Sequence, residues 1–492
     1  KDIAFKIIDF ISQFEDELVK IWNKPKFVKN SNYVITLDRI RIIQLIEEIL
    51  KHNNIENQIK EWKELGIVDK NLNKENVIES VIERDLTGKH LSNKYEHLPI
   101  DTKYFKDLEL KILSLFDDLD KSLDGWLIKS ENYQALNTIL PKFKEKVQTI
   151  YIDPPFNLDS SDQFLYRTNY KDANWATLLE NRLRIAKNWL NEKGSIFVRC
   201  DYNGNWIVRC LMDEIFGREN FRNEIVVKRG SPKAGLFEQF GTLKTIGVMY
   251  DNLYLYSKVP ETGWKGFIKV LDKKKEGYWA SFKKIYDRPT MRYEIEGINL
   301  EKGQWMWSKE RTYKAVENYK KYLEISKETG ESLDDYSRKT GITEFVRKHN
   351  NAIQYWVTPK EEVLLDNSWL DISGYSSTTD FKTENSEILL KRVIESTSIE
   401  GDLVMDFFLG SGTTTAVAHK LGRKWIGIEM GEHFYTVVLP RMKKVLAYDK
   451  SGISKENDVK EYYNEKNAGG FFKYYELEQY EEALANCKYE DG

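Results

Sequence analysis

Cysteine and histidine are scarce in this chain. Its 492 residues include three cysteines, Cys200, Cys210 and Cys487, and six histidines. So few cysteines argue against a disulfide framework and fit a reducing cytoplasm. The histidines are not spaced as metal ligands relative to one another or to the cysteines, so we expect no metal site.

Long apolar runs and a secretory pattern are also missing. No apolar run reaches the roughly 18 residues that suggest a membrane span, and the N-terminus lacks the pattern of a signal peptide. The net charge is only −3. The chain as a whole is therefore not a general polyanion binder, and any nucleic-acid site must come from local patches. What remains is a cytoplasmic globular protein, without membrane contact and with enough apolar residues for a large core.

The character of the sequence changes along its length and suggests five segments. Residues 1–120 are expected to form a helical N-terminal region and a linker, because stretches such as RIIQLIEEIL carry apolar residues at helical spacing. Residues 121–258 and 366–450 alternate strand-like and helix-like stretches, which predicts α/β structure. Residues 259–365 form an insert rich in Lys, Tyr and Trp. Residues 451–492 are a tail or the start of a further domain, with a Gly-Gly break before a helical pattern.

The stretch DPPF directly follows an apolar run, Ile150–Ile152, that predicts a short buried strand. Asp153 would then lie at the carboxyl end of the strand, where open α/β sheets bind ligands. Pro154 and Pro155 have no backbone N–H and a fixed φ, which leaves main-chain carbonyls free to accept from a ligand. Phe156 adds a flat apolar face. The stretch predicts a rigid clamp for a flat group with hydrogen-bond donors; a turn acid and a core phenylalanine are the alternative interpretation.

A second stretch, DFFLGSGTT, places a glycine-rich turn between an expected strand and an expected helix. Gly410 and Gly412 permit a tight turn and close approach of a ligand. The N–H groups at the start of the helix favour an anionic group. Glu429 ends the next expected strand, where a carboxylate can accept from two ribose hydroxyls. The expected cofactor-binding residues are Asp406, Phe408, Gly410, Ser411, Gly412, Thr413 and Glu429.

Three kinds of nucleotide site were weighed for this turn. A phosphate-binding P-loop requires GxxxxGK[ST], but no lysine follows these glycines. An NAD site requires a third glycine, and the chain has Thr413–Thr415 there. A G-x-G turn with an acid at the end of the following strand fits S-adenosylmethionine (AdoMet).

Taken together, the two stretches resemble the amino-directed DNA methyltransferases, which modify adenine N6 or cytosine N4. DPPF matches the catalytic tetrapeptide of that family, and FLGSG at 408–412 matches its F-x-G-x-G cofactor motif. The catalytic motif comes first and a long insert follows, which is similar to the β group that includes the modification subunits of type III restriction–modification systems. The chain departs from the family pattern at Phe407, where proline is usual, and at Asn385-Ser386, where Lys-Pro is frequent.

The resemblance implies an α/β fold, with a Rossmann-like AdoMet-dependent methyltransferase sheet and an inserted target-recognition domain at 259–365. It also implies that Asp153, Pro154, Pro155 and Phe156 are catalytic. The acid and the Pro154 carbonyl would accept the two N–H groups of the amine, and Phe156 would stack on a base flipped out of the duplex. Aspartate in the first position goes more often with adenine N6. Cytosine N4, or an inactive DNA-recognition subunit, is the alternative.

The insert carries the basic residues expected to contact DNA. Between Trp264 and Lys321 there are 15 Lys and Arg, 8 Asp and Glu, a balance of +7, and 11 aromatic residues. Such a mixture suits phosphate and base contacts together. Alternatively, the aromatic residues form the core of the insert and the lysines a solvated face. The expected DNA-contacting residues are Lys273, Lys274 and Lys275 of the insert, together with Lys228 and Arg229 in the earlier stretch VKRGSPKAG, which follows an expected strand.

Double-stranded DNA is therefore the expected partner. We found no PD…ExK-type nuclease cluster and no helicase P-loop in the sequence, so DNA cleavage would require a restriction subunit with helicase and nuclease activity. A homodimer, formed through the N-terminal helices or the tail, is a further expectation.

Overall fold

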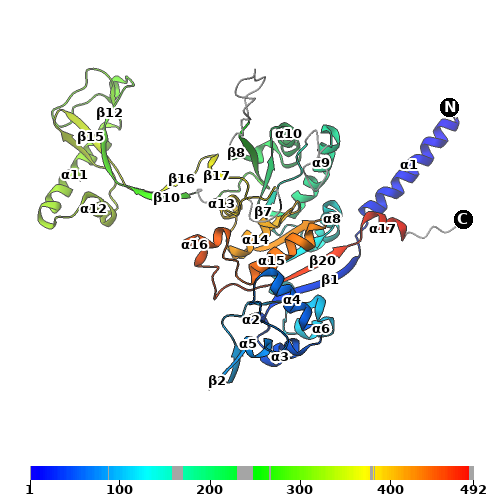
Figure 1. Ribbon diagram of the computed structural model, residues 1–492. Helices are drawn as coiled ribbons and strands as arrows, with labels where there is room; N and C mark the ends of the chain where they lie inside the picture. Colours follow the sequence, from blue (N-terminus) through cyan, green and yellow to red (C-terminus); the bar gives the residue numbers. More distant parts are fainter. Residues whose placement is uncertain are drawn as a thin grey trace, which may run out of the picture. The chain divides into compact units, whose positions relative to one another are not determined.

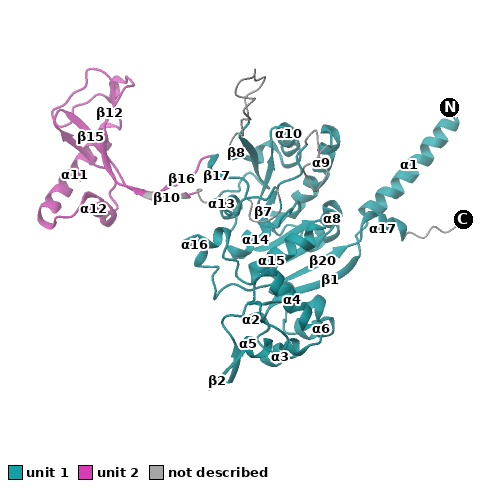
Figure 2. Ribbon diagram, viewed as in Figure 1, with its two compact units in different colours: residues 1–265, 367–492 teal, residues 266–366 magenta. Residues whose placement is uncertain are grey.

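The computed structural model describes residues 2–86, 88–157, 170–229, 248–264, 268–376, 381 and 383–486, without the side chains of residues 269, 270, 272 and 273. The chain forms two compact units, residues 1–265 with 367–492, and residues 266–366 (Figure 2). No helix in the described ranges is long and apolar enough to cross a membrane.

An eleven-stranded sheet organises the first unit (Figure 1). Its six central strands, from β7 to β20, are parallel, and antiparallel pairs extend both edges. This confirms the predicted α/β, Rossmann-like sheet. In spatial order the strands are β17 (Ser368–Ser373), β8 (Phe221–Lys228), β9 (Tyr250–Ser257), β7 (Leu190–Cys200), β6 (Val147–Ile152), β18 (Leu403–Asp406), β19 (Lys424–Glu429), β5 (Gly125–Lys129), β20 (Phe471–Leu477), β1 (Val28–Thr36) and β4 (Pro99–Asp101).

Helices cover both faces of this sheet because its central strands are apolar on both sides. Along β6, Ile150 and Ile152 pack into the main core cluster with side chains of the helices on one face. Thr149 points to the other face, where its hydroxyl lies 2.8 Å from that of Thr397. The first face carries α8 (Asn132–Phe143), α9 (Asp172–Trp189) and α10 (Asn205–Phe216), and the second carries α13 (Glu387–Thr397), α14 (Thr413–Lys420) and α15 (Leu439–Leu446).

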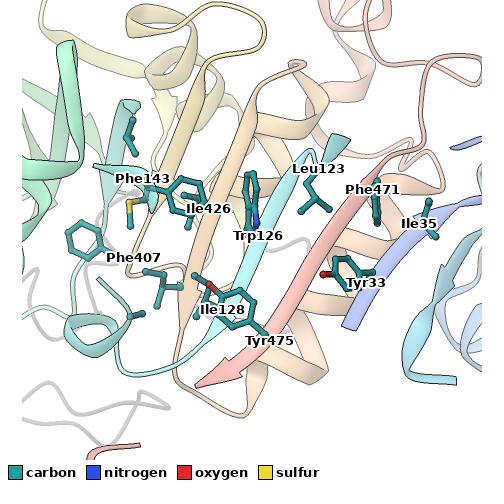
Figure 3. Packing of buried hydrophobic residues seen from close by; sticks show 14 of the residues in the cluster. Tyr33, Ile35, Leu123, Trp126, Ile128, Phe143, Phe407, Ile426, Phe471 and Tyr475 are labelled. Atoms are coloured by element: carbon teal, nitrogen blue, oxygen red, sulfur yellow. The ribbon is translucent and has the colours of Figure 1, made fainter. Parts of the chain in front are cut away.

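The N-terminal region, expected to be helical, contains helices and in addition contributes strands to the sheet. β1 pairs antiparallel with both β20 and β4. Tyr33 and Ile35 of β1 join Phe471 and Tyr475 of β20 and Trp126 of β5 in one buried cluster (Figure 3). β1 is stabilised by a partner more than 400 residues away in the sequence, and local periodicity cannot reveal such a pairing.

The tail also belongs to the sheet, so its assignment as a separate tail or further domain is wrong. After Gly469 and Gly470 the chain forms β20, which lies parallel to β5. α9 ends at Trp189, and β7 begins at the next residue, with Gly194 inside the part of β7 where its pairing with β6 is irregular.

The second unit has its own apolar core. Phe282 and Trp305 pack with Val346, while Tyr336 and Phe345 form a second cluster. Most aromatic residues of the basic and aromatic stretch are therefore core residues, as in the alternative interpretation. The unit contains β10 (Ile268–Lys275), β11 (Tyr278–Ser281), β12 (Lys283–Lys284), β13 (Gln304–Trp305), α11 (Lys309–Thr329), α12 (Leu333–Thr340), β14 (Val346–His349), β15 (Ala352–Val357) and β16 (Lys360–Leu364).

The first helix, α1 (Asp2–Asn23), has no buried residue and exposes large apolar side chains along most of its length. Only its C-terminal end is anchored, where Trp22 contacts the rings of Tyr133 and Tyr480. The other helices and the remaining hairpin of the first unit are α2 (Leu37–Ile40), α3 (Ile43–Lys51), α4 (Ile55–Leu65), α5 (Val77–Val81), β2 (Ile82–Asp85), β3 (Gly88–Leu91), α6 (Lys106–Leu113), α7 (Leu119–Ser122), α16 (Asn457–Lys460) and α17 (Tyr480–Ala485).

Candidate active site

The two motifs meet at one cavity of about 350 Å³, at the carboxyl ends of the parallel strands. DPPF follows β6, FLGSG follows β18, and these two strands are neighbours in the sheet. This is the position at which open α/β sheets bind ligands. Of the residues predicted from the two motifs, the cavity is lined by Asp153, Pro155, Phe408, Gly410, Ser411 and Glu429.

The two carboxylate oxygens of Asp153 have different surroundings. Oδ2 accepts a hydrogen bond from Asn385 Nδ2 at 3.0 Å. Oδ1 is buried and bonds to none of the described residues. Burial raises the pKa of Asp153 to about 6, against the opposing effects of the Arg199 charge and the Asn385 hydrogen bond. Asp153 therefore carries a buried acceptor atom that is still available in the wall of the cavity.

The rest of DPPF is held by neighbouring side chains. The Pro155 carbonyl accepts from the Trp175 indole N–H at 2.7 Å. Pro154 and Phe156 do not line the cavity, and Phe156 is only 9% exposed. The Arg229 guanidinium lies over the Phe156 ring, 5.6 Å from its centroid. Stacking of a base on Phe156 therefore requires a rearrangement of Arg229 or of the ring itself.

Asp406 supports the FLGSG turn from outside the cavity. Its Oδ1 accepts from the Phe408 N–H at 2.9 Å, and its Oδ2 accepts from the Thr414 hydroxyl at 2.6 Å. Burial raises its pKa to about 7. Gly412, at φ 82°, forms the left-handed N-cap of α14. Asp406, Gly412 and Thr413 were predicted to bind the cofactor, and all three lie outside the cavity lining.

Glu429 joins the turn to the end of β19. Its Oε2 accepts from the Gly410 N–H, and its Oε1 accepts from the N–H groups of Met430 and Gly431, each at 2.9 Å. Oε1 uses both of its lone pairs in these bonds, whereas Oε2 uses one, so Oε2 can still accept from a ligand in the cavity.

Several cavity residues were missed by the sequence reasoning. Ser130, Glu131 and Asn132 follow β5, a third parallel strand with its carboxyl end at the same edge. The carboxyl end of that strand is a signal from which these three residues could have been predicted to line the site. Arg182 forms an ion pair with Glu131 from the middle of α9, which no local pattern marks. Further lining residues are Tyr170, Leu178, Phe381, Thr383, Asn385, Phe407, Leu409, Ile428, Met430, Gly431 and His433.

The predicted DNA-contacting residues are scattered. Lys228 is exposed at the end of β8, whereas Arg229 lies 3.5 Å from the Asp201 carboxylate, beside the active site. Lys274 pairs with Glu361 at 2.8 Å. Lys275 is exposed on β10. The side chain of Lys273, and most of the loop after Arg229, lie outside the described residues.

Comparison with known families matches residues 147–439 to the model of the N6/N4 DNA methyltransferases, described as DNA methylase. This match covers more than half of the chain and contains both motifs. The chain therefore belongs to the DNA methylase family, and the resemblance drawn from DPPF and FLGSG is confirmed.

The chain is also similar to individual proteins. The chain is 30% identical over 423 residues to a Haemophilus influenzae protein named as the HindVI Mod subunit of a type III restriction–modification enzyme, covering 73% of this chain and 54% of that one. It is 28% identical to the type II methyltransferase M.EcaI of Enterobacter cloacae, over 67% of this chain and 71% of that one. Among solved structures, PvuII DNA methyltransferase (cytosine-N4-specific) has 14% identity and a TM-score of 0.38, over 68% of this chain and 90% of that one. The chain spans about half the length of the HindVI relative.

Proposed function

We propose that this protein is a site-specific DNA methyltransferase that transfers a methyl group from AdoMet to adenine N6, as the modification subunit of a restriction–modification or phage-defence system. The observation that carries this proposal is the shared cavity, which is lined both by Asp153, with its one unbonded carboxylate oxygen, and by the turn at Gly410. Family membership and the Mod-subunit relative support the substrate class.

The residues of the cavity fit AdoMet. The volume of the cavity lies within the roughly 300–1,000 Å³ typical of small-ligand sites. Glu429 is placed to accept from ribose hydroxyls, while Ile428 and Phe381 offer apolar surface to an adenine ring. AdoMet brings an electrophilic methyl group on a sulfonium, and an unpartnered carboxylate oxygen on the opposite motif is suited to a neighbouring positive centre.

Asp153 would act by positioning rather than by full proton abstraction. The lone pair of an exocyclic amine is delocalised into the ring, so the amine is a weak nucleophile until its N–H groups are held out of the ring plane. Oδ1 can accept one N–H, and the negative charge of Asp153 stabilises the positive charge that develops on the nitrogen. As the new nitrogen–carbon bond forms, the carbon–sulfur bond breaks, and the nitrogen then releases one proton.

The predicted role of the Pro154 carbonyl and the stacking role of Phe156 remain part of this proposal. The target atom is unreachable inside a duplex, so the base must be flipped, at a cost of a few kcal/mol. Stacking on an aromatic ring contributes about 1–3 kcal/mol and offsets much of that cost. Arg229, which now covers the Phe156 ring, would move when the base enters.

The decisive experiment measures transfer of labelled methyl groups to duplex DNA of diverse sequence. Wild type should label DNA, and Asp153→Ala should lose at least about a thousandfold in rate while still binding AdoMet in calorimetry. Glu432→Gln is the matched control, because its carboxylate is exposed and pairs with Lys129. A wild-type protein that labels RNA or protein but never DNA would refute the substrate class.

Digestion of the labelled DNA to nucleosides then identifies the base. N6-methyladenine is the expected product. N4-methylcytosine in its place would show that the protein has the alternative, cytosine-N4 activity. A protein that binds DNA but not AdoMet would instead be an inactive recognition subunit.

We also propose that the second unit reads the DNA target. After β12 its chain exposes Ile285 (98%) and Tyr286 (77%), flanked in sequence by Lys283, Lys284 and Arg288. Such a segment is suited to DNA contact, because the basic side chains can bind phosphates and the exposed apolar pair can insert at base steps. The double variant Ile285→Ala with Tyr286→Ala should weaken specific DNA binding about tenfold or more. The control is Ile325→Ala, which changes an exposed apolar residue of α11 and should leave DNA binding unchanged. Both variants should bind AdoMet as tightly as wild type in calorimetry.

The proposed partners are a second copy of this chain and a separate restriction subunit, in the cytoplasm. A restriction subunit is suggested by the Mod-subunit relatives, whose names place them in type III enzymes. Self-association is suggested by the apolar surface of α1.

A further inference from the structure

A network of buried polar side chains surrounds Asp153 and belongs to neither motif. Asn385, between β17 and α13, is its centre. Its Nδ2 donates to Asp153 Oδ2, while its Oδ1 accepts from Arg199 Nη1 at 2.5 Å and from the Tyr151 hydroxyl at 2.9 Å. Arginine can only donate, so the amide oxygen must face Arg199 and the amide N–H₂ must face Asp153. The orientation of Asn385 is therefore fixed by its partners.

Arg199, near the end of β7, is itself tightly held. Its side chain is fully buried, and Nη2 pairs with Asp251 Oδ2 at 2.7 Å. Nη1 also donates to the Gly374 carbonyl at 2.9 Å. The guanidinium lies over the Tyr375 ring, 4.1 Å from its centroid, and the Tyr375 hydroxyl donates to the same oxygen of Asp251. A Cβ on Gly374 would approach Arg199 Nη2 to 2.5 Å, so the space for the guanidinium depends on glycine there.

The network makes the two oxygens of Asp153 unequal. Oδ2 is occupied by Asn385 and lies 3.9 Å from Arg199 Nη1. Oδ1 is the oxygen left for a ligand. A hydrogen bond to the charged form and a nearby positive charge both favour the ionised carboxyl group, and they oppose the effect of burial.

We propose that Asn385, anchored by Arg199, is a positioning residue that directs Oδ1 of Asp153 toward the target amine and keeps the carboxylate ionised. This inference rests on the proposed methyl transfer. Asn385 gains and loses no proton in that reaction; it acts only through Asp153. It occupies the place where the family frequently has Lys-Pro.

A different role for Asn385 is direct contact with the cofactor, because its side chain also lines the cavity. The two roles predict different measurements. A positioning residue changes the titration of Asp153 and kcat, whereas a cofactor ligand changes the affinity for AdoMet.

The test is to titrate the Asp153 carboxyl group in the Asn385→Leu variant. The titration is monitored by ¹³C NMR of labelled aspartate, and the Asp153 signal is assigned by its absence from Asp153→Asn. We expect the midpoint to rise by about one pH unit, because a hydrogen bond to a charged group is lost. Thr383→Val is the control, since it alters the same cavity wall and has no hydrogen bond to Asp153 among those described; its midpoint should match wild type. An unchanged midpoint in Asn385→Leu would overturn the inference.

Gly374→Ala provides a second variant that leaves Asn385 and the cavity wall intact. Its methyl group should displace Arg199, and the Asp153 midpoint should rise in the same direction. In kinetics, both variants should lower kcat by about 10- to 100-fold with little change in AdoMet dissociation constant. Weaker AdoMet binding with an unchanged Asp153 midpoint would instead assign Asn385 to the cofactor. Because the titration needs no turnover, its result stands apart from the DNA-labelling test of the proposed function.

Discussion

Asp153 combines two properties that oppose each other in most carboxylates. Its burial favours the neutral form, whereas the chemistry requires a charged acceptor. The conflict is limited by Asn385 and Arg199, which favour the charged form through Oδ2 and leave Oδ1 free for a ligand. The result is a carboxylate with a pKa near 6 that is still ionised at neutral pH.

This value predicts the pH dependence of the enzyme. The raised pKa means that Asp153 becomes protonated as the pH falls through about 6, so kcat/KM should fall about tenfold between pH 7 and pH 5. Initial rates of DNA labelling at subsaturating substrate check this, with circular dichroism confirming that the protein stays folded. A profile that is flat down to pH 5 would mean an ordinary aspartate.

At the scale of elements, the cofactor turn depends on a carboxylate from the next strand. Glu429 bonds to the Gly410 N–H, so one side chain joins the ends of β18 and β19. A ligand hydroxyl bound by Glu429 would therefore be held in a fixed position relative to the glycine turn. The same carboxylate would stabilise both the empty turn and the bound ligand.

Replacing Glu429 tests this dual role. Glu429→Ala should weaken AdoMet binding about 100-fold, because hydrogen bonds to a charged group are worth about 1.5–3 kcal/mol each. It should also lower the melting temperature by a few degrees, since three backbone N–H groups lose their acceptor. Glu432→Ala, three residues away and exposed, is the control in calorimetry and thermal melting. Equal affinities of the two variants would exclude Glu429 as a ligand of the cofactor.

The elements that the sequence predicted well are those with local signals. β6 and β18 are short apolar strands that lie just before DPPF and FLGSG. The apolar run therefore predicts the strand, and the motif predicts where that strand ends. β1 and β20 were missed because their pairing joins opposite ends of the chain, and no local pattern marks such a pairing. Arg199 and Asp251 were missed for the same reason: they lie on adjacent antiparallel strands, and their pairing follows from sheet order rather than from spacing.

At the scale of the whole molecule, α1 exposes large apolar side chains along most of its length. Its residues at 4, 7, 11, 14, 18 and 21 are apolar and follow alternating steps of three and four, the pattern by which two helices bury a shared seam. Leu18 and Ile21 are half-buried, whereas Ile7, Ile11 and Phe14 are exposed. A symmetric contact with a second copy would cover the exposed part.

Self-association through this seam is directly testable. Wild type should sediment as a dimer at micromolar concentration, and Ile11→Asp should sediment as a monomer because a charge on the seam is desolvated. Ser12→Asp, on the next residue and off the seam, should remain a dimer. Monomeric wild type over the same concentrations would remove α1 from the interface.

The pairing of β1 with β20 also constrains how the molecule is made. During synthesis, β1 has to wait for a partner that emerges more than 400 residues later, and β20 is the link between β1 and the parallel core. At roughly 5–20 residues per second, that wait lasts about half a minute or more, during which the edge of the nascent sheet stays open. A chain that is released after β1 but before β20 has been made would therefore have an unfinished sheet, and such a chain is a natural substrate for chaperones and proteases.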